Sequence, residues 1–158
     1  MYTPIDYNLL NENKACGPQL DLIKKHFGLK PIPLTKEVVS NLSYLFDIDW
    51  IAKRFLTEKD FIKYKKAQYP AFKKYIKADD EALAQHEETT HLAWKEYDEV
   101  VDSNWANGGR SNSKAARKYN KAQDLANLHY NNKCKLARAE YRKVIALEFI
   151  KLYKKGMA

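Results

Sequence analysis

The chain has 158 residues, 45 % of them hydrophobic, and a formal net charge of +8. Its 11 Tyr, 6 Phe and 3 Trp are enough to build a packed core, which argues against a globally disordered chain. No apolar run approaches the ~20 residues of a membrane span, so no membrane partner is expected.

The first 28 residues predict one short helix. Residues 1–15 show no clear helical pattern. They also lack the basic and apolar regions of a signal peptide, so none is expected. Gly17 and Pro18 suit the start of a helix, and Gly28 suits the position just past its end. We therefore expect a helix between these positions.

Two more short helices are predicted in the next segment, each with its own capping residue. Thr35 can cap a helix over residues 36–46. Asp47 or Asp49 can cap another over residues 50–56, and the sequence leaves both possibilities open. Together these segments predict a cluster of short helices with apolar residues on their inner faces.

A longer helical segment starts near residue 57. Thr57, followed three residues later by Asp60, resembles a capping box in which Asp replaces the usual Glu. Pro70 lacks the N–H that an inner helical position needs, so we expect it to interrupt or kink the helix. The segment is then expected to continue toward residue 78.

The best helix formers in the chain occupy its second half. Residues 79–106 predict one long helix and residues 113–155 another, with turn-forming residues at 107–112 between them. A short loop leaves the two helices adjacent and antiparallel. The sequence therefore predicts a coiled-coil-like antiparallel helical hairpin.

No segment alternates convincingly between apolar and polar residues, so the predicted fold class is all-α. We expect a small helical head over residues 1–78, completed by residues 143–158, and a hairpin over residues 79–142. The end of the chain is apolar almost all round, which indicates burial on several sides. The expected core partners are Val144, Ile145, Leu147, Ile150 and Leu152 against Leu42, Leu45, Trp50, Ile51 and Phe55.

Opposite charges on the two long helices support the hairpin. Residues 79–109 carry nine acidic and one basic side chain, whereas residues 110–158 carry 13 basic and three acidic ones. If the loop is symmetric, position i faces about position 219 − i. That register places Trp94 and Tyr97 over Ala122, Leu125 and Ala126, Leu83 over Leu136, and Glu96, Asp98 and Glu99 near Arg117, Lys118 and Lys121.

Histidine and cysteine positions do not predict a metal site or a catalytic site. His86 and His91 are five residues apart, which separates them around a helix and excludes the zincin arrangement. In the hairpin register His91 comes near His129 and His86 near Cys134, but no carboxylate is placed to complete a metal site. No catalytic residue, metal, cofactor or small-molecule substrate is expected, and the chain is not predicted to be an enzyme.

The two cysteines bear on location. Cys16 and Cys134 lie far apart in sequence and form no Cys-x-x-Cys pair, so neither a disulfide framework nor a cysteine-based zinc site is indicated. A reducing, cytoplasmic environment is the expected location.

A basic segment with interleaved aromatic residues is the strongest functional signal. Residues 53–78 carry nine basic and two acidic side chains. Lysines neutralise phosphates without reading sequence, and exposed aromatic rings can stack on bases. The candidate nucleic-acid-binding residues are Lys59, Lys63, Lys65, Lys66, Lys73, Lys74, Lys77, Tyr64, Tyr69 and Tyr75, with Arg110 and Lys114 at the hairpin tip.

A simpler interpretation of this segment stays open. Its aromatic residues can belong to the core, with the lysines forming an ordinary solvated helix face. Phe61, Ile62 and Phe72 are assigned to the core in either case.

Two classes of binding function follow. The first is a basic accessory factor that binds DNA or RNA without sequence specificity. The alternative is a protein–protein interaction module or inhibitor that docks its hairpin or head on a larger intracellular protein. Phage and mobile-element factors that block a host enzyme are of this second type.

Overall fold

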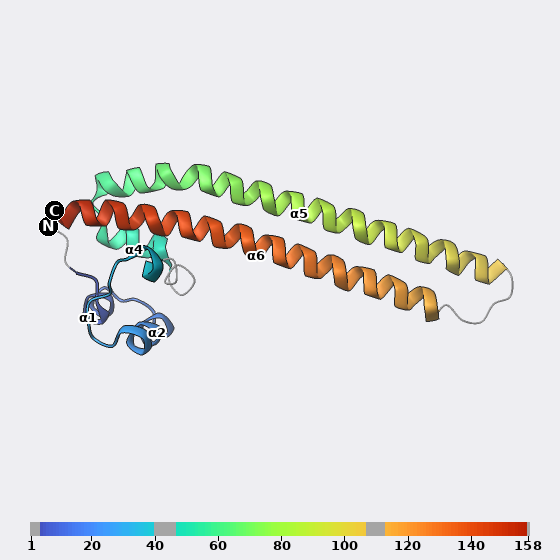
Figure 1. Cartoon of the computed structure of the whole chain (residues 1–158), viewed down its shortest axis with the longest axis horizontal. Coiled ribbons are helices and arrows are strands. Elements are labelled where there is room, and N and C mark those ends of the chain that lie inside the picture. The colour runs from blue at the N-terminus through green and yellow to red at the C-terminus, as the bar shows by residue number, and fades with distance from the viewer. Residues whose placement is uncertain (1–3, 40–46, 107–112, 158) are drawn as a thin grey trace. The chain divides into compact units, whose positions relative to one another are not determined.

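A computed structural model describes residues 4–39, 47–106 and 113–157 of the chain. Within these ranges the secondary structure is helical with no strand, which confirms the all-α fold class. The helices are α1 (Tyr7–Glu12), α2 (Gly17–Phe27), α4 (Ile48–Phe55), α5 (Glu58–Ala106) and α6 (Ser113–Met157), as labelled in Figure 1.

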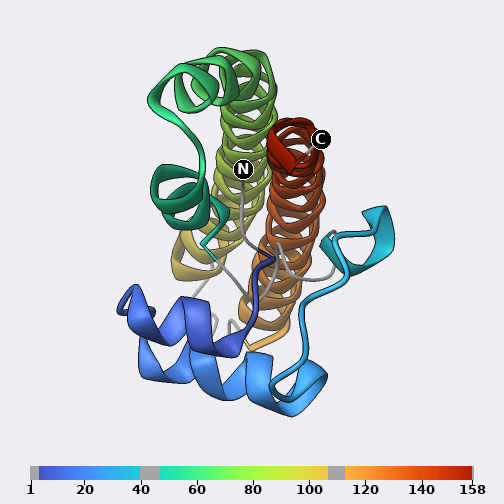
Figure 2. The same ribbon diagram turned by 90° about the vertical axis from the view of Figure 1, so that its left-hand side faces the viewer.

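The chain divides into two compact units. Met1–Lys73 and Ala139–Ala158 form one of them, which we call the head unit, and Lys74–Arg138 form the other, which we call the hairpin unit. Helices α5 and α6 contribute to both units. In the head unit, α1 and α2 lie side by side (Figure 2).

Capping side chains define the starts of the short helices. The Leu9 N–H donates to the Asp6 carboxylate at 2.8 Å and begins α1, a helix that the sequence analysis missed because six residues carry too little periodic signal. The Trp50 N–H donates to the Asp47 carboxylate at 3.0 Å, so Asp47 rather than Asp49 caps α4. Gly28 follows α2 with φ of +64°, a conformation that favours glycine.

The two threonine caps that the sequence predicts are also present. The Val38 N–H donates to the Thr35 hydroxyl oxygen at 3.2 Å and begins a helical stretch at residues 36–39; the rest of the expected helix falls in 40–46, outside the described residues. The Asp60 N–H donates to Thr57 Oγ1 at 3.2 Å, and the Thr57 hydroxyl donates back to the Asp60 carboxylate at 3.0 Å. These two bonds confirm the capping box ahead of α5.

Helix α5 runs without interruption through Pro70, so of the two alternatives expected at this residue, an interruption or a kink, the interruption is wrong. Proline removes a single backbone donor, and Pro70 lies on an exposed side of the helix. The helix continues for 36 residues beyond it, to Ala106, and the many hydrogen bonds on either side outweigh one missing bond. One long helix therefore replaces the two that the sequence analysis expected.

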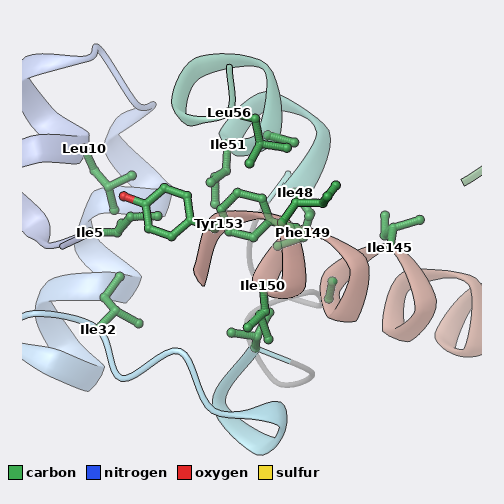
Figure 3. Close-up of a cluster of buried hydrophobic side chains, with 14 of the residues drawn as sticks. Ile5, Leu10, Ile32, Ile48, Ile51, Leu56, Ile145, Phe149, Ile150 and Tyr153 are labelled. Atoms are coloured by element: carbon green, nitrogen blue, oxygen red, sulfur yellow. The ribbon is translucent and has the colours of Figure 1, made fainter. Parts of the chain in front are cut away.

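The core of the head unit forms around the C-terminal end of α6. Phe149 and Tyr153 are almost fully buried, and Figure 3 shows them among isoleucines and leucines from α4 and the N-terminal segment. The buried residues of this end of α6 are Ile145, Ala146, Phe149, Ile150, Leu152 and Tyr153. They recur every three or four residues, so a single broad face of α6 supplies the centre of the core.

Most of the expected core partners are confirmed. Ile145, Ile150, Leu152 and Ile51 are buried, and Leu147, Trp50 and Phe55 pack against the core while partly buried. Val144 is the exception, because 44 % of it is exposed. It precedes the buried face by one residue, which turns its side chain toward solvent. Leu42 and Leu45 lie outside the described residues.

In the hairpin unit α5 packs against α6 in an antiparallel arrangement (Figure 1). Lys118 donates to the Glu96 carboxylate, which confirms one of the expected charge pairs. The Trp94 ring meets Tyr119 edge-on with centroids 5.6 Å apart, whereas a symmetric loop would place Leu125 opposite Trp94. The predicted register is therefore shifted, by six residues at this contact and by three at the Tyr97–Tyr119 contact, because side-chain packing rather than loop symmetry sets it.

Candidate nucleic-acid interface

A run of 18 residues in α5, 61–78, contains six lysines and no acidic residue. Within the head unit, Lys59, Lys63, Lys66 and Lys73 follow one another by four, three and seven residues, so they share one face of the helix. All four are exposed. We call these four residues, with Tyr69 at their edge, the lysine face.

Contacts within the lysine face are few and weak. Lys63 pairs with Asp60 at 2.7 Å across one exposed turn of helix, an interaction that contributes little to stability. The Lys73 ammonium lies 4.7 Å from the centroid of the Tyr69 ring. Tyr69 is 57 % exposed, so a cation and an open aromatic ring lie together on this surface. The arrangement can bind a phosphate and offer a stacking surface to a base.

Lys65 points to another side of α5 and belongs to a polar cluster. Its ammonium donates to the Asp49 carboxylate at 2.9 Å and to Gln68 Oε1 at 2.9 Å. The Gln68 amide donates to both Asp49 oxygens at 3.0 Å and also to the Tyr141 hydroxyl. This cluster links α4, α5 and α6 within the head unit, and it pairs Lys65 with a carboxylate, whereas Lys59 and Lys66 of the lysine face have no such pair among the described residues. Sequence reasoning missed the cluster because its members are up to 92 positions apart, from Asp49 to Tyr141.

Tyr64 is not available to a ligand, which corrects its assignment as a base-stacking residue. The side chain is fully buried and stacks beside Phe61, with ring centroids 6.1 Å apart. Its hydroxyl has no hydrogen-bond partner among the described residues. Burial raises the pKa of Tyr64 above its ordinary value, and the nearby negative charge of Asp49 raises it further.

Replacing this tyrosine tests the buried hydroxyl. We expect Tyr64→Phe to keep or raise the free energy of unfolding at neutral pH, by about 1 kcal/mol, because it removes an unpartnered polar group. The parent should lose stability as pH rises above about 10, since the unfolded chain ionises first while the folded protein holds the Tyr64 proton. Urea unfolding at pH 7 and 10.5 would measure both effects.

Tyr69→Phe is the matched control, because that hydroxyl is exposed. A Tyr64→Phe protein that loses stability at neutral pH would show that the hydroxyl is satisfied.

Other aromatic residues of the segment divide between the core and the surface. Phe61 packs against the core as expected, but Ile62 and Phe72 are 50 % and 43 % exposed, which corrects their assignment to the core. Tyr75, in the hairpin unit, is half-buried beside the Arg138 guanidinium. Tyr69 is therefore the candidate ring with the most open surface.

The remaining candidate residues lie in the hairpin unit or outside the described residues. Lys74 is exposed, and Lys77 pairs with Glu81 at 3.7 Å on the same helix. Lys114 is exposed in the first turn of α6. Arg110 falls in 107–112, outside the described residues, as does the predicted loop.

The histidines and Cys134 do not come together as a metal site. His86 Nε2 lies 2.8 Å from the Asn127 amide oxygen, and its ring packs on Tyr130 at 5.6 Å. Cys134 lies near Asp79 and Tyr130, and desolvation raises the pKa of its thiol, which disfavours the thiolate that metals bind. Among the described residues no three His, Cys, Asp or Glu side chains are grouped to hold a metal ion.

Comparison with protein-family models, curated proteins and solved structures finds no match to this chain. In residues 4–39, 47–106 and 113–157, no helix combines the length and the apolar character needed to cross a membrane.

Proposed function

We propose that the protein is a non-enzymatic factor that binds nucleic acid, DNA or RNA, through the lysine face without reading sequence. The observation that carries this proposal is the exposed row formed by Lys59, Lys63, Lys66 and Lys73 on one face of α5. Lysines on one helix face can contact successive phosphates, and each contact releases condensed counterions. The free thiols Cys16 and Cys134 are consistent with the cytoplasmic location that we include in the proposal.

Neutralising the lysine face tests the proposal. We expect replacement of Lys59, Lys63, Lys66 and Lys73 by Gln to abolish binding to random oligonucleotides at moderate salt. Fluorescence anisotropy with labelled single- and double-stranded 20-mers would measure it. Exposed lysines contribute little to stability, so thermal unfolding should stay close to that of the parent.

A second quadruple variant controls for net charge. Lys25, Lys30, Lys36 and Lys154 are also exposed residues of the head unit, and their replacement by Gln lowers the net charge by the same four units. This control should lose far less affinity than the lysine-face variant. Equal losses of oligonucleotide affinity in the two variants would contradict a defined interface. They would show only that a basic protein attracts nucleic acid through its net charge.

Tyr69 gives a separate prediction on strand preference. Replacing it with Ala should weaken single-stranded binding by about 1–3 kcal/mol, because one base loses its stacking partner. Duplex binding should change much less, since a duplex does not expose base faces. Equal effects on both substrates would remove Tyr69 from the interface. Tyr75→Ala provides the comparison with a half-buried ring.

A protein-binding module or inhibitor is the second candidate, and the hairpin unit favours it. Trp105 is 80 % exposed and Leu136 is 68 % exposed. Large apolar side chains left in solvent are typical of a surface that binds another protein. If the parent protein bound no oligonucleotide at low salt, this candidate would replace the first.

A further inference from the structure

The hairpin unit leaves most of its apolar side chains uncovered. Among its described residues only Ala82 and Ala126 are buried. The large apolar residues that are between 42 % and 80 % exposed in this unit are Leu83, Leu92, Trp94, Val100, Trp105, Leu125, Leu128 and Leu136. In a pair of helices each helix can bury only the side that faces the other, so apolar residues on other sides stay exposed. Stable antiparallel bundles commonly contain four helices.

One side of the hairpin carries two hollows with small residues at their base. The first, of about 290 Å³, lies between α5 and α6 and includes Ala82, Ala126 and the exposed Leu125. The second, of about 260 Å³, includes alanines from both helices and the exposed Val100. Alanine allows another helix to approach closely. The large side chains beside the alanines, such as Leu125, can then fill the hollows of a partner helix pair. We call this side the hollow face.

The charge of the hairpin unit is self-complementary. Residues 79–106 of α5 carry nine acidic and one basic side chain, and residues 113–138 of α6 carry seven basic and one acidic. Over residues 74–138 the 11 basic and ten acidic side chains nearly cancel, whereas the residues of the head unit carry 17 basic and ten acidic ones. Because the net charge of this unit is near zero, two hairpin units can meet without the charge repulsion that the basic head units retain.

We propose that the hollow face is the interface with a second copy of this chain, forming a four-helix bundle from two hairpins. In this dimer α5 of each copy lies over α6 of the other, related by a two-fold axis along the hairpins. Each acidic helix then has a basic neighbour in its own chain and another in the partner. An axis across the hairpins would instead place acidic α5 over acidic α5, which like-charge repulsion opposes.

The opposite side of the hairpin is the competing surface. Trp94 and Trp105 are 11 residues apart, close to three helical turns, so they share one side of α5, and neither lines a hollow. Trp94 already packs on Tyr97 and Tyr119, with ring centroids 5.6 Å apart in each case. The hollow face offers two hollows between α5 and α6 that side chains of a partner helix can fill, and this difference selects it.

The mass of the full chain in solution tests the dimer. Sedimentation equilibrium should give about twice the 18.5 kDa of one chain, and Leu125→Gln should weaken self-association by at least about tenfold. Because Leu125 is 48 % exposed within one chain, this change should leave the helix content unaltered. Trp105→Gln is the matched control and should leave the mass unchanged. A monomeric parent at about 100 μM, or a dimer broken by Trp105→Gln and not by Leu125→Gln, would overturn the proposal.

Charge exchange tests whether opposite charges hold the two copies together. One variant replaces Glu96, Glu99 and Asp102 with Lys, and a second replaces Lys114, Lys118 and Lys121 with Glu. Each alone should sediment at 18.5 kDa, and their equimolar mixture should return to about twice that mass, because basic helices of one then oppose acidic helices of the other. A mixture that stays monomeric would reject charge pairing between the two copies.

The dimer stands independently of the proposed nucleic-acid binding. Leu125 is no part of the lysine face, so the mass measurements succeed or fail whatever the protein binds.

Discussion

Ending the chain at Lys143 is expected to unfold the head unit. The truncation removes Phe149 and Tyr153 together with four other buried residues of α6. Loss of a large buried apolar side chain costs about 2–5 kcal/mol, and a whole domain is stable by only about 5–15 kcal/mol. Fluorescence of Trp50, which packs against this core, should shift to that of a solvent-exposed indole, and the circular dichroism signal should fall.

A shorter truncation supplies the control for this experiment. Removing residues 154–158 leaves every described core residue of α6 in place, so unfolding should remain cooperative with nearly the parent stability. If the chain ending at Lys143 stayed folded and cooperative, the head unit would not depend on α6.

Single substitutions on α6 are expected to lower the free energy of unfolding far more at buried positions than at exposed ones. Phe149→Ala should lower the free energy of unfolding by about 3–5 kcal/mol, because a 2 % exposed ring leaves a cavity. Val144→Ala, five residues earlier on the same helix, should cost less than about 1 kcal/mol, because that side chain is 44 % exposed. Urea unfolding followed by Trp50 fluorescence would measure both. Similar losses for the two variants would contradict the described face of α6.

Local sequence signals predicted the elements of this fold well. The capping box at Thr57 and Asp60 and the glycine after α2 are both present, because each depends on residues within one turn. Pro70 misled the prediction, because a proline rule considers one lost hydrogen bond and ignores the length of helix around it. Helix α1 was missed because its six residues carry too little periodic signal.

Contacts between distant residues were harder to predict. Loop symmetry suggested a hairpin register, but packing of Trp94 on Tyr119 decides it. In the candidate interface, lysine spacing alone identifies the common face of Lys59, Lys63 and Lys66. The same sequence does not reveal that Tyr64 faces the core while Tyr69 faces solvent, because tyrosine suits both environments.

The salt dependence of oligonucleotide binding by the parent protein tests the central claim most directly. Four phosphate contacts from the lysine face predict that the logarithm of the binding constant falls with the logarithm of salt concentration with a slope of roughly −3 to −4. The lysine-face variant, if it binds at all, should give a slope near zero. Absence of binding by the parent at about 20 mM salt, or binding that does not weaken as salt rises, would contradict the claim that this surface binds nucleic acid through phosphates.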